Sequence, residues 1–236
     1  MVARNGRPEW SLRTPAPVMI GFNRRLGPNF AALKAARNKG QIGKPDLLPI
    51  TSFGPGPPPV ARIKVSGGLF RDRMIHDFHR ANFIMDAAPV SVLATGFSIV
   101  DPAIGAAGDI DTAVVTMPYA DGRIAVIKNS RRAVHGDDQH VEPLGSEGLL
   151  QAQIMLENPV VKSTTAGVTG AKPTCFFLER YMPAYRADWA AFVMAATEAG
   201  PLPVTLANGV AALAMAEAAT LSLRSGGPAR PQDLTA

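Results

Sequence analysis

The feature that most limits the fold is a series of short apolar segments in the middle of the chain, separated by tight turns. Asp121-Gly122 joins two of them, and this pair is a strong hairpin signal because both turn positions require positive φ. Tight hairpins predict a largely antiparallel sheet. The expected strands are residues 89–100, 112–119, 123–130, 139–143, 149–154 and 158–163.

Helical patterns lie before and after these segments. In the third helix, Tyr185, Trp189 and Phe192 recur at helical spacing and predict one buried stripe. Thr205 is a suitable N-cap for the fourth, and Gly226 is placed to end it. The layout predicts an α+β fold, an open and largely antiparallel sheet with helices on one face. The expected helices are residues 28–38, 69–85, 178–198 and 206–224.

The ends of the chain carry weaker patterns. Residues 1–16 are rich in Arg, Pro, Asn and Gly without a period, and we expect a disordered leader. Short apolar segments at 17–22 and 47–52 are expected to be strands. We therefore expect one domain over residues 17–228 and a loose tail over 229–236.

Charge and cysteine content narrow the class of protein. The net charge is +5, and residues 1–45 carry nine Lys or Arg against one acid. Only Trp10 and Phe22 are aromatic before Phe30, so no stacking platform for nucleic acid is expected. The single Cys175 excludes an internal disulfide and fits a reducing cytoplasm.

No apolar run is long and uninterrupted enough to predict a membrane span. The most apolar late stretch, residues 210–221, contains Glu217 and is rich in alanine, so it predicts a packed helix. A membrane partner is not expected.

Asp72 and His76 are the best candidates for acid–base chemistry. They lie four residues apart on the expected helix, so their side chains share one face. A carboxylate beside an imidazole favours the imidazolium and fixes the ring, and a pKa near about 6.5 suits proton transfer. The spacing alone favours an ordinary Asp–His pair on the helix surface. His79 continues this face, but no Cys or Glu has ligand spacing, so no metal is expected.

Five segments in order resemble the Gfo/Idh/MocA oxidoreductases, most closely the bacterial inositol 2-dehydrogenases. The similarity begins at Gly21-Phe22-Asn23-Arg24-Arg25 and covers nearly the whole chain from about Pro17. Each segment alone is a weak signal, but together they are specific. The segments are VMIGFNRRLGPNF, VSGGLFRDRMIHDF, GDIDTAVVTM, NSRRAV and FFLERYMPAYRADWAAF.

The resemblance implies NAD-dependent oxidation of myo-inositol or a related polyol at a ring hydroxyl. His76 would take the proton from the hydroxyl and Asp72 would orient and polarise His76. Arg24 and Asn23 would lie beside the substrate. The family also implies a homo-oligomer, which we expect to form through the open face of the sheet.

The family's NAD-binding Rossmann domain is not matched. Neither G-x-G-x-x-G nor the family's Glu-Lys-Pro motif occurs, so no cofactor-binding residue is expected in this chain and weak or no activity is expected from it alone. The family's Tyr-Gly-Tyr-Asp stretch corresponds to residues 135–138, where Asp137 replaces a substrate-contacting tyrosine. The alternative is a non-catalytic oligomerisation or binding module derived from such an enzyme.

Overall fold

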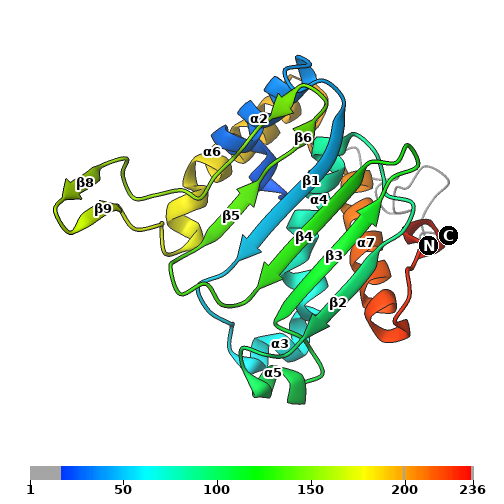
Figure 1. The fold of residues 1–236 in the computed structure, drawn as a ribbon. Coiled ribbons are helices and arrows are strands. Elements are labelled where there is room, and N and C mark those ends of the chain that lie inside the picture. The colour runs from blue at the N-terminus through cyan, green and yellow to red at the C-terminus, as the bar shows by residue number, and fades with distance from the viewer. Residues whose placement is uncertain (1–16, 199, 235–236) are drawn as a thin grey trace.

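The computed structural model describes residues 17–198 and 200–234, and its centre is one mixed sheet (Figure 1). Its strand order is β2-β3-β4-β1-β6-β7, with β5 also paired to β1. Only the β1–β4 pair is parallel among the pairs described. The strands are β1 (Pro45–Phe53), β2 (Leu93–Phe97), β3 (Thr112–Pro118), β4 (Ile124–Ser130), β5 (Asp138–Val141), β6 (Leu144–Gly145) and β7 (Gly148–Leu149).

The predicted hairpin between β3 and β4 is present. Its register pairs Val115 with Ile127 and Thr112 with Ser130. Only Gly122 of the two turn residues has positive φ, at 88°, so the turn differs from the one expected of Asp-Gly while the pairing is kept.

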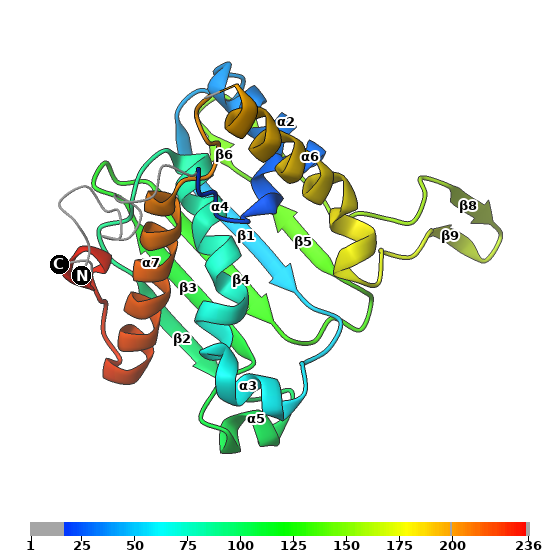
Figure 2. The same ribbon diagram turned by 180° about the vertical axis from the view of Figure 1, so that it is seen from behind.

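The helices cover one face of the sheet (Figure 2), which confirms the predicted α+β fold with a largely antiparallel sheet. In the view of Figure 1 the long helices lie behind the sheet. The long helices are α2 (Pro28–Asn38), α4 (Ile75–Met85), α6 (Phe177–Thr197) and α7 (Leu206–Ser225); the shorter ones are α3 (Val60–Ser66), α5 (Pro102–Ala106), η1 (Asn23–Leu26), η2 (Phe70–Met74) and η3 (Pro231–Leu234).

The core lies between the sheet and helices α4 and α7. Alternating residues of β3 and β4 point inward, and Val115 and Ile127 are fully buried against the helices. Met74 and Phe78 meet them from the helical side, and both are fully buried. Burial of such side chains stabilises each position by roughly 1.5–3 kcal/mol, which holds the helix carrying the candidate site firmly on the sheet.

Helix α7 is the apolar stretch that the sequence predicted to be a packed helix. By length and composition it is the one described helix that could cross a membrane. Its small residues instead pack against α4 and β2, with Ala212, Ala216 and Ala219 fully buried. The Thr205 side chain caps the first turn of α7 by accepting a hydrogen bond from the backbone N–H of Asn208. Gly226 ends the helix with φ 71°, and both features are as predicted.

Several expectations differ from the structure. The strand expected over 149–154 is absent except for Leu149 in β7 and an isolated bridge at Ala152, and the strand expected over 158–163 lies outside the main sheet, in β8 (Val161–Thr164). Residues 17–22 form no strand, because the chain there makes one backbone bond to the 200–205 segment, from Ile20 to Val204 at 3.3 Å, and meets no sheet edge. The apolar stripe on α6 is not buried: Trp189 is 67% exposed, because α6 packs on η1 through Tyr181 and Ala184 instead.

The tail over 229–234 is packed and not loose. Ala229 pairs with Val92 in a β-bridge, and Pro231 is buried where η3 meets α7. The expected leader, residues 1–16, lies outside the described residues.

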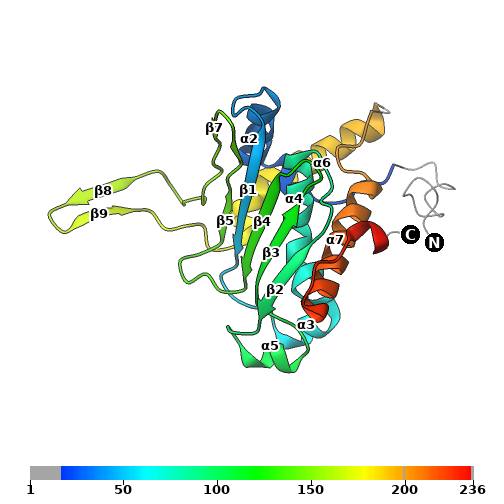
Figure 3. The same cartoon turned by 45° about the vertical axis from the view of Figure 1, so that its right-hand side comes forward.

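A two-stranded arm extends from the body of the molecule (Figure 3). It consists of β8 (Val161–Thr164) and β9 (Gly167–Gly170), which pair with each other and with no other strand in the described part of the chain. All eight strand residues are exposed.

Candidate functional site

A cavity of about 560 Å3 opens on the helical side of the sheet. Segments that are far apart in the sequence form its wall, and all four residues predicted for the site line it. The lining residues are Asn23, Arg24, Pro55, Gly56, Pro57, Pro58, Arg62, Asp72, Arg73, His76, Arg131, Asp137, Phe176, Phe177, Tyr181 and Tyr185.

The long helix predicted at 69–85 carries Asp72 and His76 and contains an irregular turn. Residues Phe70–Met74 form a π-helical turn, η2, that runs directly into α4. Such turns are rare and frequently occur at functional sites. Here the turn holds Asp72 and Arg73, while His76 follows in the first turn of α4, and all three reach the cavity.

His76 is a neutral base in this environment. Burial, and then the charge of Arg24, lowers the pKa of His76 to about 3. The expected pKa near 6.5 and the imidazolium favoured by Asp72 are therefore wrong for this structure, because desolvation and the charge of Arg24 outweigh the Asp77 carboxylate, which raises the pKa. The His76 Nδ1 atom is buried and has no hydrogen-bond partner among the described residues, so it can receive one from a ligand.

Asp72 bonds to arginines. Its Oδ1 accepts from Arg62 at 2.9 Å and its Oδ2 from Arg131 at 3.4 Å. Within the residues that the structure describes, no hydrogen bond joins Asp72 to His76. The predicted orienting role of Asp72 stays a prediction.

The two predicted substrate residues lie on η1. Arg24 donates to Asp77 at 3.2 Å and to Gln139 at 3.3 Å, and its guanidinium carbon is 5.2 Å from the Tyr181 ring centre. Asn23 is 4% exposed, and its Nδ2 has no partner in the described part of the chain. Asn23 thus has a free donor at the cavity, whereas Arg24 is already held by protein groups.

Asp77 is the principal site residue that the sequence interpretation missed. It is fully buried, pairs with Arg80 and Arg24, and accepts from Asn129 at 3.0 Å. Burial alone would raise the pKa of Asp77, but the charges of Arg80 and Arg24 hold it below its usual range. The available signal was its position: Asp77 falls between Met74 and Phe78 on the buried side of the helix.

His79 lies behind the cavity and not in it. Its ring stacks on Phe22 with the centres 4.3 Å apart, while His76 meets the same ring edge-on at 5.5 Å. Burial, followed by Arg25 and Arg80, lowers the pKa of His79 to about 3. Among the residues described, no group of three or more His, Cys, Asp or Glu could hold a metal ion.

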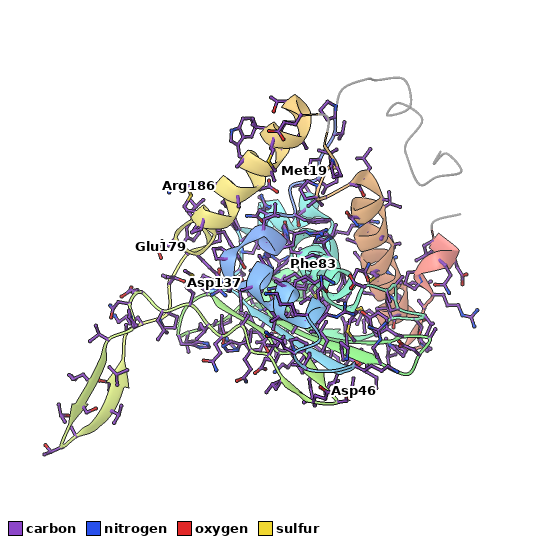
Figure 4. All side chains as sticks on the ribbon, turned by 90° about the horizontal axis from the view of Figure 1, so that it is seen from above. Met19, Asp46, Phe83, Asp137, Glu179 and Arg186 are labelled. Atoms are coloured by element: carbon purple, nitrogen blue, oxygen red, sulfur yellow. The ribbon has the colours of Figure 1, made fainter. Side chains whose placement is uncertain are left out.

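Arg73 and Asp137 also line the cavity; the sequence interpretation missed Arg73, and only the family resemblance indicated Asp137. Asp137 accepts from Gln139 Nε2 at 3.2 Å. In Figure 4, seen from above, it lies beside the amino-terminal part of α6, where Arg180 donates to its backbone carbonyl at 3.5 Å. Asp137 is the residue that, by the family resemblance, replaces a substrate-contacting tyrosine.

Comparison with known proteins decides the family. Residues 30–151 match the sequence model described as the GFO/IDH/MocA C-terminal domain. The chain belongs to the Gfo/Idh/MocA family. The resemblance predicted from the sequence is thereby confirmed.

Similar family members include inositol dehydrogenases. The myo-inositol 2-dehydrogenase of Thermotoga maritima is 45% identical over 87% of this chain and 62% of its own length. The inositol 2-dehydrogenase of Rhizobium meliloti is 42% identical over 89% of this chain and 64% of its own. The chain thus spans somewhat less than two thirds of these relatives.

Solved structures agree with the fold. A myo-inositol dehydrogenase from Corynebacterium glutamicum superposes with a TM-score of 0.85 at 38% identity, covering 90% of this chain and 64% of that one. A scyllo-inositol dehydrogenase from Lactobacillus casei, solved with NAD(H) and scyllo-inositol, gives 0.80 at 26% identity, covering 90% and 64%.

Proposed function

We propose that the cavity binds a cyclic polyol such as myo-inositol and that the protein takes part in oxidation of one ring hydroxyl. The observation that carries the proposal is the convergence of Asn23, Arg24, Asp72 and His76, from two separate helical segments, on one cavity. Buried polar atoms without partners, Asn23 Nδ2 and His76 Nδ1, suit the hydroxyls of such a ligand.

His76 is the group in this proposal that receives the proton. An imidazole whose pKa lies near 3 is neutral at pH 7, so a nitrogen is free to accept a hydrogen bond from a substrate hydroxyl. The same low pKa makes His76 a weak base, so loss of the hydride must drive the proton transfer. As the hydroxyl carbon loses hydride, the hydroxyl oxygen becomes a carbonyl and its proton passes to His76. Asp77 holds Arg24 in the cavity wall through an ion pair, and Asp72 holds Arg62 and Arg131 there in the same way.

NAD is proposed as the hydride acceptor, by similarity to the Lactobacillus casei protein solved with NAD(H). The residues of this chain fit the substrate but include no recognisable site for the dinucleotide. The sequence has no G-x-G-x-x-G loop that could hold a dinucleotide pyrophosphate, so the cavity residues supply the substrate side of the reaction. The chain's own contribution is binding, orientation and the proton acceptor.

Calorimetric titration of the 236-residue chain with myo-inositol tests polyol binding directly. We expect saturable binding that weakens at least tenfold in His76→Ala. His140→Ala is the matched control, because His140 lies outside the cavity and faces Asp138. Reduced-nicotinamide absorbance with NAD and myo-inositol then tests oxidation. If no polyol binds the wild-type chain, the proposed function is wrong.

The homo-oligomer is proposed on a separate observation, the apolar outer face of the sheet. Leu93, Val114 and Ile124 are each about 40% or more exposed, on three adjacent strands facing away from the helices. Monomeric proteins rarely expose large contiguous apolar patches, so a second copy of this chain is the proposed cover. This face also supports the non-catalytic alternative, which predicts assembly without polyol binding.

A further inference from the structure

We propose that Arg73 is the anchor for an oxyanion on the ligand, so that the preferred substrate is a polyol carrying a carboxylate or a phosphate. This inference rests on the proposed polyol-binding function and specifies its substrate class. It starts from a cation in the cavity that has no ion pair among the residues that the structure describes.

Arg73 differs from the other arginines of the cavity in its partners. Arg24 pairs with Asp77, and both Arg62 and Arg131 pair with Asp72. Arg73 has no hydrogen bond or ion pair within the described ranges, and its Nε is buried without a partner. A guanidinium carries five donors, and leaving them unmet in a partly buried site costs free energy that a bound anion would recover.

The guanidinium of Arg73 packs closely against the backbone at Gly54. A Cβ atom on Gly54 would lie 2.5 Å from Arg73 Nη1 and 2.7 Å from both Cζ and Nη2. These similar distances mean that the guanidinium plane lies across the Gly54 backbone, which only a glycine permits. Its donor edge is then available to an acceptor in the cavity, the arrangement that suits bidentate contact with a carboxylate or phosphate.

The surrounding charges also favour an anion. The cavity wall carries four arginines and two aspartates, Asp72 and Asp137. Burial, and then the charge of Arg24, lowers the pKa of Arg73, so the protonated form is incompletely compensated by Asp137 and Asp77. An oxyanion beside Arg73 would offset both the desolvation and the repulsion from Arg24.

Matched pairs of ligands test the inference on the full chain by calorimetry. The pairs are myo-inositol 1-phosphate against myo-inositol and D-glucuronate against D-glucose, with inorganic phosphate alone as a further probe. We expect at least one charged polyol to bind ten times more tightly than its neutral partner, and to bind more tightly than inorganic phosphate. A preference in the inositol pair would indicate a phosphate ligand, and a preference in the glucose pair would indicate a carboxylate.

Arg73→Met should remove this preference, bringing each charged polyol to within about twofold of its neutral partner. Arg71→Met is the control, because Arg71 lies on the same helical turn but pairs with Glu217 outside the cavity, with Nη2 at 2.6 Å from Oε2. Arg73→Lys keeps the positive charge but loses the two parallel N–H donors of the guanidinium. Its preference for charged polyols should lie between those of the wild type and Arg73→Met.

Equal binding of charged and neutral polyols by the wild type would overturn the inference, as would a preference that survives in Arg73→Met. Binding of inorganic phosphate as tight as that of myo-inositol 1-phosphate would also overturn it. In the first case myo-inositol still binds and the proposed function stands, so the two failures are distinguishable. The comparison in the wild type does not depend on folding of any variant.

Discussion

The Asp77 carboxylate lies 3.2 Å from Nη1 of Arg24, and this ion pair ties helix α4 to the short helix η1 across the floor of the cavity. The same carboxylate pairs with Arg80 and accepts from Asn129 on β4. One buried side chain therefore holds together two helices and a strand. Its contribution can be measured without any ligand.

Asp77→Asn should strongly destabilise the fold. Removing one partner of a buried ion pair leaves uncompensated charge, here on Arg80 and Arg24, at a cost of about 3–5 kcal/mol. Urea unfolding followed by circular dichroism measures the loss. Asp46→Asn, an exposed carboxylate on β1, should leave the unfolding midpoint unchanged. A stable Asp77→Asn protein would show that the network contributes little.

Stability should fall as the pH drops from 7 to 5. The pKa of His79 is about 3 in the folded protein and near 6.5 when unfolded, so the unfolded chain binds more protons in this window. The free energy of unfolding should decrease by about 2 kcal/mol for this residue between pH 7 and pH 5.

His79→Phe keeps the ring on Phe22 and removes the titration, so its stability should depend less on pH over the same range. His135→Gln is the control, because the His135 ring is about half exposed at the surface beside Asp138 and is not packed in the core. An unchanged slope in His79→Phe would contradict the assignment of a low pKa to His79.

Gly54→Ala should change ligand preference more than stability. The atoms that the new methyl group meets belong to the end of the Arg73 side chain, which can move away. We therefore expect a small change in melting temperature and loss of the preference for charged polyols. If the variant still prefers charged polyols, close packing of Arg73 against Gly54 is not needed for that preference.

Gly145→Ala should have the opposite effect. Its methyl group would lie 2.3 Å from the Ile42 carbonyl oxygen and 2.8 Å from that of Lys44, and backbone atoms cannot move aside cheaply. Overpacking of this kind costs about 1–3 kcal/mol. Thermal unfolding measures it, and polyol preference should be retained because Gly145 does not line the cavity.

Val114→Glu should dissociate the proposed oligomer. Val114 lies on the outer face of β3 opposite Lys128, so a glutamate there gains a cross-strand partner while disrupting the apolar surface. Sedimentation analysis should show a smaller species. Val134→Glu, at an exposed loop position, should sediment like wild type. A monomeric wild type would refute the proposal.

Local patterns predicted the parts of this fold that depend on neighbours in the sequence. The helix over 69–85 and the hairpin at Asp121-Gly122 follow from periodicity and turn chemistry within a few residues. The segment over 17–22 has strand-like composition but meets no sheet edge, and composition cannot reveal that.

The electrostatics of the site could not be predicted in this way. The low pKa of His76 depends first on burial and then on the charge of Arg24, which is 52 positions earlier in the sequence. The Arg73 guanidinium has no ion pair among the described residues. This absence could not be predicted, because it depends on Asp72 and Asp77 pairing with other arginines instead. Spacing along one helix identified which residues meet the cavity, but not the charge state or the partners they have there.

The parallel pairing of β1 with β4 has a consequence for synthesis of the protein. Leu47 pairs with Ile124, and on its other side Ile50 pairs with Val141. The middle strand thus leaves the ribosome before either of its neighbours exists, while β3 and β4 can close on each other at once. Nascent chains arrested before β4 has emerged from the ribosome should therefore contain a β1 segment that proteases still cleave.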